Sequence, residues 1–152
     1  MSIFPQFDYS SPRWFEKLKF YLKKHEGLRL KPYTDTAGKI TIGIGRNLSD
    51  NGITLEEAEL FLQRDACDAV LSARLIFGDR FDQLSDPRKV VISDMIFNLG
   101  VTRFQQFTKL IRAVSVGDYP TAANEMLGSL WAKQVGERAK ELASMMRTGE
   151  WS

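Results

Sequence analysis

The residues with the clearest potential for chemistry are two carboxylates and a hydroxyl, Glu26, Asp35 and Thr41, within one run from His25 to Gly45. The local sequence places them at a helix end, in a turn and on a strand. Two acids that face each other across a gap can cleave a glycosidic bond, one as an acid and the other as a base. Hydrolysis of a sugar polymer is therefore the first chemistry to consider.

Each of these residues also has an ordinary explanation. Glu26 is either a general acid that protonates the leaving oxygen or an exposed glutamate beside a helix end. Asp35 either activates a water molecule or bonds its own turn backbone. Thr41 either orients that water or is a strand residue chosen for β-propensity. Singly, the ordinary explanations are better; together, with glycines nearby, the three residues favour a site.

The composition limits the class of protein. Of the 152 residues, 43% are hydrophobic and 26% charged, which is typical of a soluble globular protein, and the net charge of +2 is too small to indicate a nucleic-acid binder. Cys67 is the single cysteine, so no intrachain disulfide can form. His25 is the single histidine, and no metal-ligand spacing is present. We expect no metal and no other cofactor.

The first residues of the chain lack the basic and apolar regions of a signal peptide. No stretch approaches the roughly 18 apolar residues of a membrane span. We therefore expect the protein to be made and folded in a cytosol.

The N-terminal part predicts three kinds of structure. Residues 1–12 are expected to form an arm, with a helix start at Ser11 and Pro12, and the helix is expected to end near Glu26 because Gly27 follows. A hairpin is expected from residues 33 to 45, with its turn at 35–38. In its second strand three isoleucines alternate with Thr41 and two glycines, so we expect the isoleucines to face a core. The other face leaves room for a ligand.

The remainder of the chain is predicted to be helical. A capping box at residues 54–57 begins a helix to about residue 76, about 30 Å long, which can join two lobes. Further helices are predicted near 87–99, 103–114, 119–131 and 136–147. The sequence predicts one α+β domain over 1–152, with an arm (1–12), a β-containing lobe (about 26–53), a connecting helix (about 54–76) and a helical lobe (about 77–151).

Residues 25–45, with their Glu-Gly, Arg, Tyr, Asp, Gly and Thr-Ile-Gly-Ile-Gly pattern, closely resemble the catalytic segment of phage-type lysozymes, the endolysin family of T-even bacteriophages. Motifs of the C-terminal half follow at family spacing. They are Asp94-Met95-Ile96-Phe97-Asn98-Leu99-Gly100, Phe107-Thr108, Trp131, Gln134, Arg138-Ala139-Lys140, Arg147-Thr148-Gly149 and Trp151. The resemblance covers roughly residues 24 to 151.

The resemblance implies a lysozyme-like α+β fold, mainly helical, with a small β lobe. It implies a muramidase that hydrolyses the β-1,4 bond between N-acetylmuramic acid and N-acetylglucosamine in peptidoglycan by an inverting mechanism, causing lysis of the bacterial wall. By the same resemblance Glu26 is the general acid, Asp35 the base that activates water, and Thr41 the residue that positions the water. In inverting enzymes the two carboxyl groups lie roughly 6.5–9.5 Å apart.

The resemblance also extends to substrate binding. Phe97 matches a residue that lines the sugar cleft, although an aromatic residue on an amphipathic helix can equally belong to a core. Asn98 and Gly43 are further candidates for contact with the glycan. Arg138 matches an arginine that pairs with the catalytic glutamate in the family, and we expect it to contact the substrate as well.

The chain departs from the family pattern in places. Arg46 replaces a histidine that pairs with an aspartate on the long helix, and Asp65 falls at the position of that aspartate. We therefore predict an Arg46–Asp65 ion pair behind the site. Leu110 and Glu125 replace polar residues that contact sugar in the T-even enzyme, so the shape of the sugar subsites is expected to differ.

The expected partners are peptidoglycan glycan strands, with no nucleic acid and no metal, and the protein is expected to be a monomer. As an endolysin it would be made in the host cytoplasm and act on the periplasmic wall after holin-dependent release. A tail-associated or injected lysozyme would use the same chemistry. Two alternatives differ in activity: an inactive lysozyme fold that binds peptidoglycan or protein, and a lytic transglycosylase, which would not need Asp35.

Overall fold

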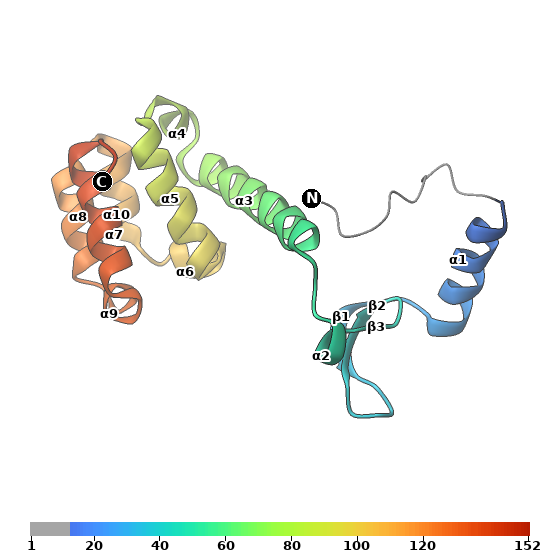
Figure 1. Ribbon diagram of the computed structural model, residues 1–152. Coiled ribbons are helices and arrows are strands. Elements are labelled where there is room, and N and C mark those ends of the chain that lie inside the picture. The colour runs from blue at the N-terminus through green and yellow to red at the C-terminus, as the bar shows by residue number, and fades with distance from the viewer. Residues whose placement is uncertain (1–12) are drawn as a thin grey trace. The chain divides into compact units, whose positions relative to one another are not determined.

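The computed structural model describes residues 13–152, and the predicted arm, with its helix start at Ser11 and Pro12, lies outside the described residues. The chain divides into two compact units, with the boundary between Ala58 and Glu59 (Figure 1). The first unit contains the strands and the second is helical. The α+β fold expected from the sequence is confirmed. The predicted partition into two lobes and a connecting helix stays a prediction.

The first described helix, α1 (Arg13–Glu26), ends at the residue where the sequence predicts its end. Gly27 follows with a φ of +73°, and its amide donates to the carbonyl of Lys23. A left-handed conformation directly after the last helical residue is a common way to end a helix, and glycine adopts it without steric cost. The predicted helix end is therefore confirmed, and it leaves Glu26 in the last turn.

Three short antiparallel strands form the sheet in the order β1-β2-β3: β1 (Arg29–Thr34), β2 (Ile40–Gly43) and β3 (Arg46–Asn47). The turn of the β1–β2 hairpin lies where the sequence predicts it, but β1 begins at Arg29, before the predicted start of the hairpin at residue 33. Pro32, which has no N–H to donate, is in the edge strand β1, where the register with β2 shifts. A short helix, α2 (Leu48–Asn51), follows β3 beside the sheet (Figure 1).

The burial of β2 differs from the prediction. Thr41 is only 3% exposed, whereas Ile40 and Ile44 are 50% and 40% exposed. Thr41 lies in the central strand, opposite Tyr33 on one side and Asn47 on the other, so neighbouring strands cover it. No residue of α1 is buried, so α1 does not form a layer that would cover the isoleucines. Within this unit the expectation that the isoleucines face a core is therefore wrong for Ile40 and Ile44, whereas Ile42 is half-buried.

The long helix α3 (Leu55–Phe77) begins at the predicted capping box. The Thr54 hydroxyl accepts from the amide of Glu57 at 3.1 Å, and the Glu57 carboxylate accepts from the amide of Thr54 at 2.8 Å. Each side chain thus satisfies an amide that the first turn leaves without a helical partner. At its other end α3 buries Ala69, Ala73 and Phe77 in the core of the second unit.

The second unit has more helices than the sequence predicts. They are α4 (Asp79–Gln83), α5 (Asp86–Leu99), α6 (Val101–Phe104), α7 (Thr108–Val116), α8 (Tyr119–Leu127), α9 (Leu130–Val135) and α10 (Glu137–Thr148). The predicted helix 103–114 is two helices, because Phe107 leaves the helical region with a ψ of 57°. The predicted helix 119–131 also divides, because the Ser129 hydroxyl caps a new helix by accepting from Ala132.

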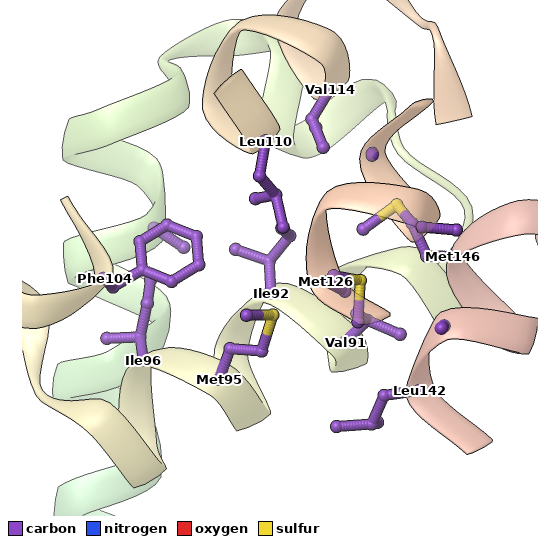
Figure 2. Packing of buried hydrophobic residues seen from close by; sticks show 14 of the residues in the cluster. Val91, Ile92, Met95, Ile96, Phe104, Leu110, Val114, Met126, Leu142 and Met146 are labelled. Carbon is purple, nitrogen blue, oxygen red and sulfur yellow. The ribbon is translucent and has the colours of Figure 1, made fainter. Parts of the chain in front are cut away.

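The core of the second unit is built around α5 (Figure 2). Its buried side chains, Val91, Ile92, Met95 and Ile96, meet residues from α6, α7, α8 and α10. In Figure 2 the side chain of Leu110 from α7 points toward Ile92. Burial of this apolar surface is the main stabilising contribution to the unit. Within residues 13–152 we find no helix that is both long and apolar enough for a membrane span.

Candidate active site

Glu26 lies at the C-terminal end of α1, with its carboxylate against the backbone of Gly45. A Cβ atom at Gly45 would be 2.9 Å from Glu26 Oε2 and 3.0 Å from its Cδ, which is closer than real Cβ contacts allow. Gly45 also has a φ of +73°, a region that other residues rarely adopt. The glycine therefore allows both the local backbone and the close approach of the carboxylate.

Asp35 is held firmly in the β1–β2 turn. Its Oδ1 accepts from the amides of Ala37 at 2.9 Å and Lys39 at 2.8 Å, and its own amide donates to the Lys39 carbonyl. The ordinary explanation for Asp35, a turn aspartate bonded to its own backbone, is thus correct as far as Oδ1 is concerned. Oδ2 is not used by the turn amides, and it faces Thr41.

Thr41 is the polar residue that the structure brings to Asp35. Its Oγ1 lies 3.5 Å from Asp35 Oδ2 and 3.3 Å from the Lys39 carbonyl oxygen. Burial in the central strand leaves this hydroxyl little freedom to turn away from the carboxylate. A carboxylate oxygen and a hydroxyl at this distance can both bond one water molecule. The pair has the groups needed to hold and deprotonate a water.

The two glycines of this segment differ in what lies beside them. Gly43 pairs with Arg29 at the end of β2 and has a φ of +71°, but a Cβ there would meet no atom within 4 Å. The strand face that was predicted to leave room for a ligand is therefore open at Gly43. At Gly45 the Glu26 carboxylate occupies the corresponding space.

Within the second unit, a groove of about 480 Å³ is lined by residues of α3, α4, α5 and α10. Phe97 lies on this groove and is 46% exposed, so it is not part of the core of the second unit. Most of the remaining lining is apolar, and Asp94 and Arg138 are among its charged residues. Leu110 and Glu125 line a separate hollow of about 360 Å³, although Leu110 itself is fully buried.

Arg138 is bonded to Asp94, which was not among the site residues expected from the sequence. Its Nε and Nη2 both donate to Asp94 Oδ1, at 3.0 and 2.7 Å. The two residues are 44 positions apart, and no local pattern connects them. The predicted pairing of Arg138 with Glu26 concerns residues of the two separate units and stays a prediction.

Asn98 is oriented by a buried indole. Trp131 Nε1 donates to Asn98 Oδ1 at 2.9 Å, and Trp131 is almost fully buried. Because an indole N–H can only donate, this bond fixes which end of the Asn98 amide is oxygen. Among the described residues nothing bonds the amide nitrogen of Asn98, which therefore has two hydrogens to offer a ligand.

Arg46 forms a two-point ion pair with Glu57, with Nη2 to Oε1 at 2.7 Å and Nη1 to Oε2 at 3.2 Å. Nη1 also donates to the Gly52 carbonyl at 3.3 Å. The bond from the Thr54 amide, together with Arg46, lowers the pKa of the Glu57 carboxyl below its usual value. The sequence predicts Asp65 as the partner of Arg46. That pair also concerns residues of separate units and stays a prediction.

Within residues 13–152, no group of three or more His, Cys, Asp or Glu side chains is placed to hold a metal ion. Cys67 is exposed on α3.

A helical unit and a three-stranded sheet with a carboxylate at a helix end define a lysozyme-like α+β protein. The phage lysozyme family model matches residues 23–148, which is most of the chain. The chain therefore belongs to the phage lysozyme family, and it is a hydrolase of the lysozyme class.

Several curated proteins are similar to this chain. An endolysin of Acyrthosiphon pisum secondary endosymbiont phage 1 is 36% identical over 129 residues, covering 81% of this chain and 84% of that protein. Probable T4-type lysozyme 2 of Dictyostelium discoideum is 26% identical over 160 residues, covering 87% and 94%. The pre-baseplate central spike protein Gp5 of Enterobacteria phage T4 is 29% identical over 155 residues, covering 84% of this chain. The match spans only 27% of the spike protein.

Proposed function

We propose that this protein is a muramidase of the endolysin type, which hydrolyses the β-1,4 bond between N-acetylmuramic acid and N-acetylglucosamine in peptidoglycan and so lyses the bacterial wall. The proposal rests on how two carboxylates and a hydroxyl are placed in the first unit. One carboxylate stands at a helix end against Gly45, and a second is fixed beside a buried hydroxyl. Membership of the phage lysozyme family supports the substrate class.

In this mechanism Glu26 donates its proton to the glycosidic oxygen as the bond from that oxygen to the anomeric carbon breaks. A water molecule held by Asp35 Oδ2 and Thr41 Oγ1 attacks the anomeric carbon, and Asp35 accepts a proton from it. The products are a free hydroxyl on the leaving sugar and a new reducing end. Glu26 finishes deprotonated and Asp35 protonated, and exchange of protons with water restores both residues.

The surroundings of Asp35 favour its use as a base rather than as a nucleophile. Two turn amides anchor Oδ1, and the hydroxyl beside Oδ2 supplies a second group to hold a water. A carboxylate that attacked the sugar directly would have no use for that hydroxyl. We therefore propose inversion at the anomeric carbon, with a carboxyl separation of roughly 6.5–9.5 Å in the complex with substrate.

We assign substrate contacts to four further residues. Gly43 offers open backbone beside Thr41, against which a sugar ring can lie. Phe97 presents an exposed ring to the apolar face of a sugar. Asn98 offers its amide nitrogen, and Arg138 offers the guanidinium nitrogen that Asp94 does not bond. Arg46 is proposed to support the segment from outside the site, through Glu57.

We propose synthesis in the host cytoplasm and release through a holin pore to the periplasmic wall, with the protein acting as a monomer. The similarity to a phage endolysin supports this route. The similarity to a baseplate spike protein supports the alternative in which the same chemistry is delivered by a phage tail.

The stereochemistry of the product tests the proposed reaction. Purified peptidoglycan is digested, and proton NMR is recorded within minutes, before the new reducing ends equilibrate. We expect N-acetylmuramic acid at the reducing end, first as the α-anomer. An initial β-anomer would contradict inversion, and 1,6-anhydro ends without reducing ends would identify a transglycosylase.

A further inference from the structure

The ion pair between Asp94 and Arg138 differs from the other ion pairs of the second unit that lie on helix surfaces. Lys89–Asp86 and Lys140–Glu137 each join residues three positions apart on one helix, and their acidic partners are largely exposed. Arg74–Asp82 joins α3 to α4, but its side chains are 53% and 57% exposed. Asp94 and Arg138 join α5 to α10, and their side chains are only 30% and 39% exposed. Partial burial makes this geometry more persistent than that of an exposed pair.

The hydrogen bonds leave one side of the guanidinium available. Both bonds from Arg138 end on a single oxygen, Asp94 Oδ1, and use Nε and Nη2. Among the residues of the second unit, none accepts a hydrogen bond from Nη1. Phe97 lies three positions after Asp94 on α5, and all three residues line the same groove. The guanidinium is therefore held at one orientation beside an exposed aromatic ring.

The charge of Arg138 is also compensated. A guanidinium paired with a carboxylate acts toward a ligand chiefly as a directed hydrogen-bond donor, whereas an unpaired one attracts any anion. A sugar hydroxyl or an acetamido carbonyl is the kind of neutral acceptor that such a donor suits. The arrangement thus favours recognition of the glycan strand itself.

We infer that Asp94 is a positioning residue for substrate binding: it holds Arg138 so that Nη1 is directed to a neutral acceptor on the glycan. The inference rests on the proposed function and deepens it. Asp94 itself does not contact the substrate; it acts through Arg138. Because both bonds end on one oxygen, the amide oxygen of an asparagine side chain can also accept both of them, through weaker bonds that keep the orientation of Arg138.

The test compares Asp94→Ala and Asp94→Asn in steady-state hydrolysis of purified peptidoglycan. Asp94→Ala should raise KM about 10-fold with kcat nearly unchanged, since an interaction made equally in the ground and transition states is lost. Asp94→Asn should restore a KM close to that of wild type. An unchanged KM in Asp94→Ala, or an equal loss in Asp94→Asn, would overturn the inference.

A double-mutant cycle separates positioning from a structural role. In an Arg138→Ala background, Asp94→Ala should have no further effect on KM, because the residue through which it acts is absent. Further loss in that background would contradict the inference. Glu137→Ala is the matched control: it breaks an exposed ion pair on α10 and should leave KM unchanged.

Binding gives a readout that does not depend on turnover. Glu26→Gln protein, alone and with Asp94→Ala or Asp94→Leu, is sedimented with intact peptidoglycan at 0.2 M salt, and bound protein is measured. Both Asp94 variants should bind about 10-fold more weakly, while thermal unfolding shows that they are folded; binding as tight as with Asp94 would overturn the inference. The proposed function fails separately, if wild-type protein does not hydrolyse the walls.

Discussion

At the scale of single residues, the position of the Glu26 carboxylate depends on a residue without a side chain. Gly45 and Gly52 both have a positive φ, of +73° and +57°. They differ in surroundings. A Cβ at Gly45 would collide with the Glu26 carboxylate, whereas one at Gly52 would meet no atom within 4 Å. This difference allows backbone strain to be separated from displacement of the Glu26 carboxylate.

Gly45→Ala and Gly52→Ala should each lose about 1–2 kcal/mol of stability, from placing an L-residue at positive φ. Only Gly45→Ala should also displace Glu26, and a misplaced catalytic group can cost about 10²-fold in rate. Initial rates of wall hydrolysis, with unfolding free energies measured in parallel, provide the comparison. Equal rate losses in the two variants would show that Gly45 does not position the acid.

The sequence identified the carboxylates and the hydroxyl but not what surrounds them. Asp35, Thr41 and the turn lie within a few positions of one another, so local patterns suffice to place them. Asp94 was missed because its partner Arg138 is distant in sequence and meets it only through the packing of α5 on α10. The contact of Glu26 with Gly45 likewise joins two elements that no periodicity connects.

At the scale of elements, the start of α3 is held by more than its capping box. Glu57 accepts from the Thr54 amide within the box and from Arg46 of β3, so one carboxylate joins a strand to the first turn of the long helix. The box could be predicted from four adjacent residues, whereas the bond from Arg46, eleven positions away, could not. The divided helices of the second unit have two different causes. The break at Phe107 has no Gly or Pro beside it, whereas Gly128 ends α8 directly before Ser129 and was a local signal that the prediction of one helix over 119–131 overlooked.

The lowered pKa of Glu57 predicts a loss of stability in acid. Because the Thr54 amide and Arg46 favour the charged form, the folded pKa lies below the reference value of 4.5. The contribution is therefore fully present above pH 4.5 and is lost as the pH falls through the folded pKa. Midpoints of thermal unfolding between pH 3 and 7, a range set by ordinary carboxyl titration, should fall less steeply in acid for Glu57→Gln than for wild type.

Glu56→Gln is the control for this experiment, because it removes a charge from the same turn of α3 without breaking the bonds to Thr54 and Arg46. Its unfolding midpoints should follow those of wild type across the range. Parallel curves for wild type and Glu57→Gln would refute the assignment of acid sensitivity to Glu57.

At the scale of the whole molecule, the two units are built differently. The second has a continuous apolar core around α5, whereas Thr41 is the residue that the described first unit buries most completely. The overall fold class could be predicted because long amphipathic helices and an alternating strand leave strong periodic patterns. The burial of Ile40 and Ile44 within the first unit was predicted wrongly, because alternation gives two faces but does not say which face is covered.

Two leucines test the importance of the second unit's core. Leu110 is fully buried, whereas Leu75 on α3 is 88% exposed. Leu110→Ala should cost about 2–5 kcal/mol, because it removes buried methyl groups and leaves a cavity, while an exposed substitution such as Leu75→Ala should stay within about 0.5 kcal/mol. Urea unfolding measures both. A loss as large at Leu75 would mean that α3 is buried on its exposed side.

The most direct test of the account is the clearing of outer-membrane-permeabilised bacterial walls by wild-type protein and by Glu26→Gln, which keeps the shape of the side chain but removes its acid. We predict rapid loss of turbidity with wild type and none with Glu26→Gln, although the variant still sediments with the walls. Clearing by Glu26→Gln at the wild-type rate would contradict the assignment of Glu26. Absence of clearing by folded wild-type protein that binds the walls would contradict the muramidase function.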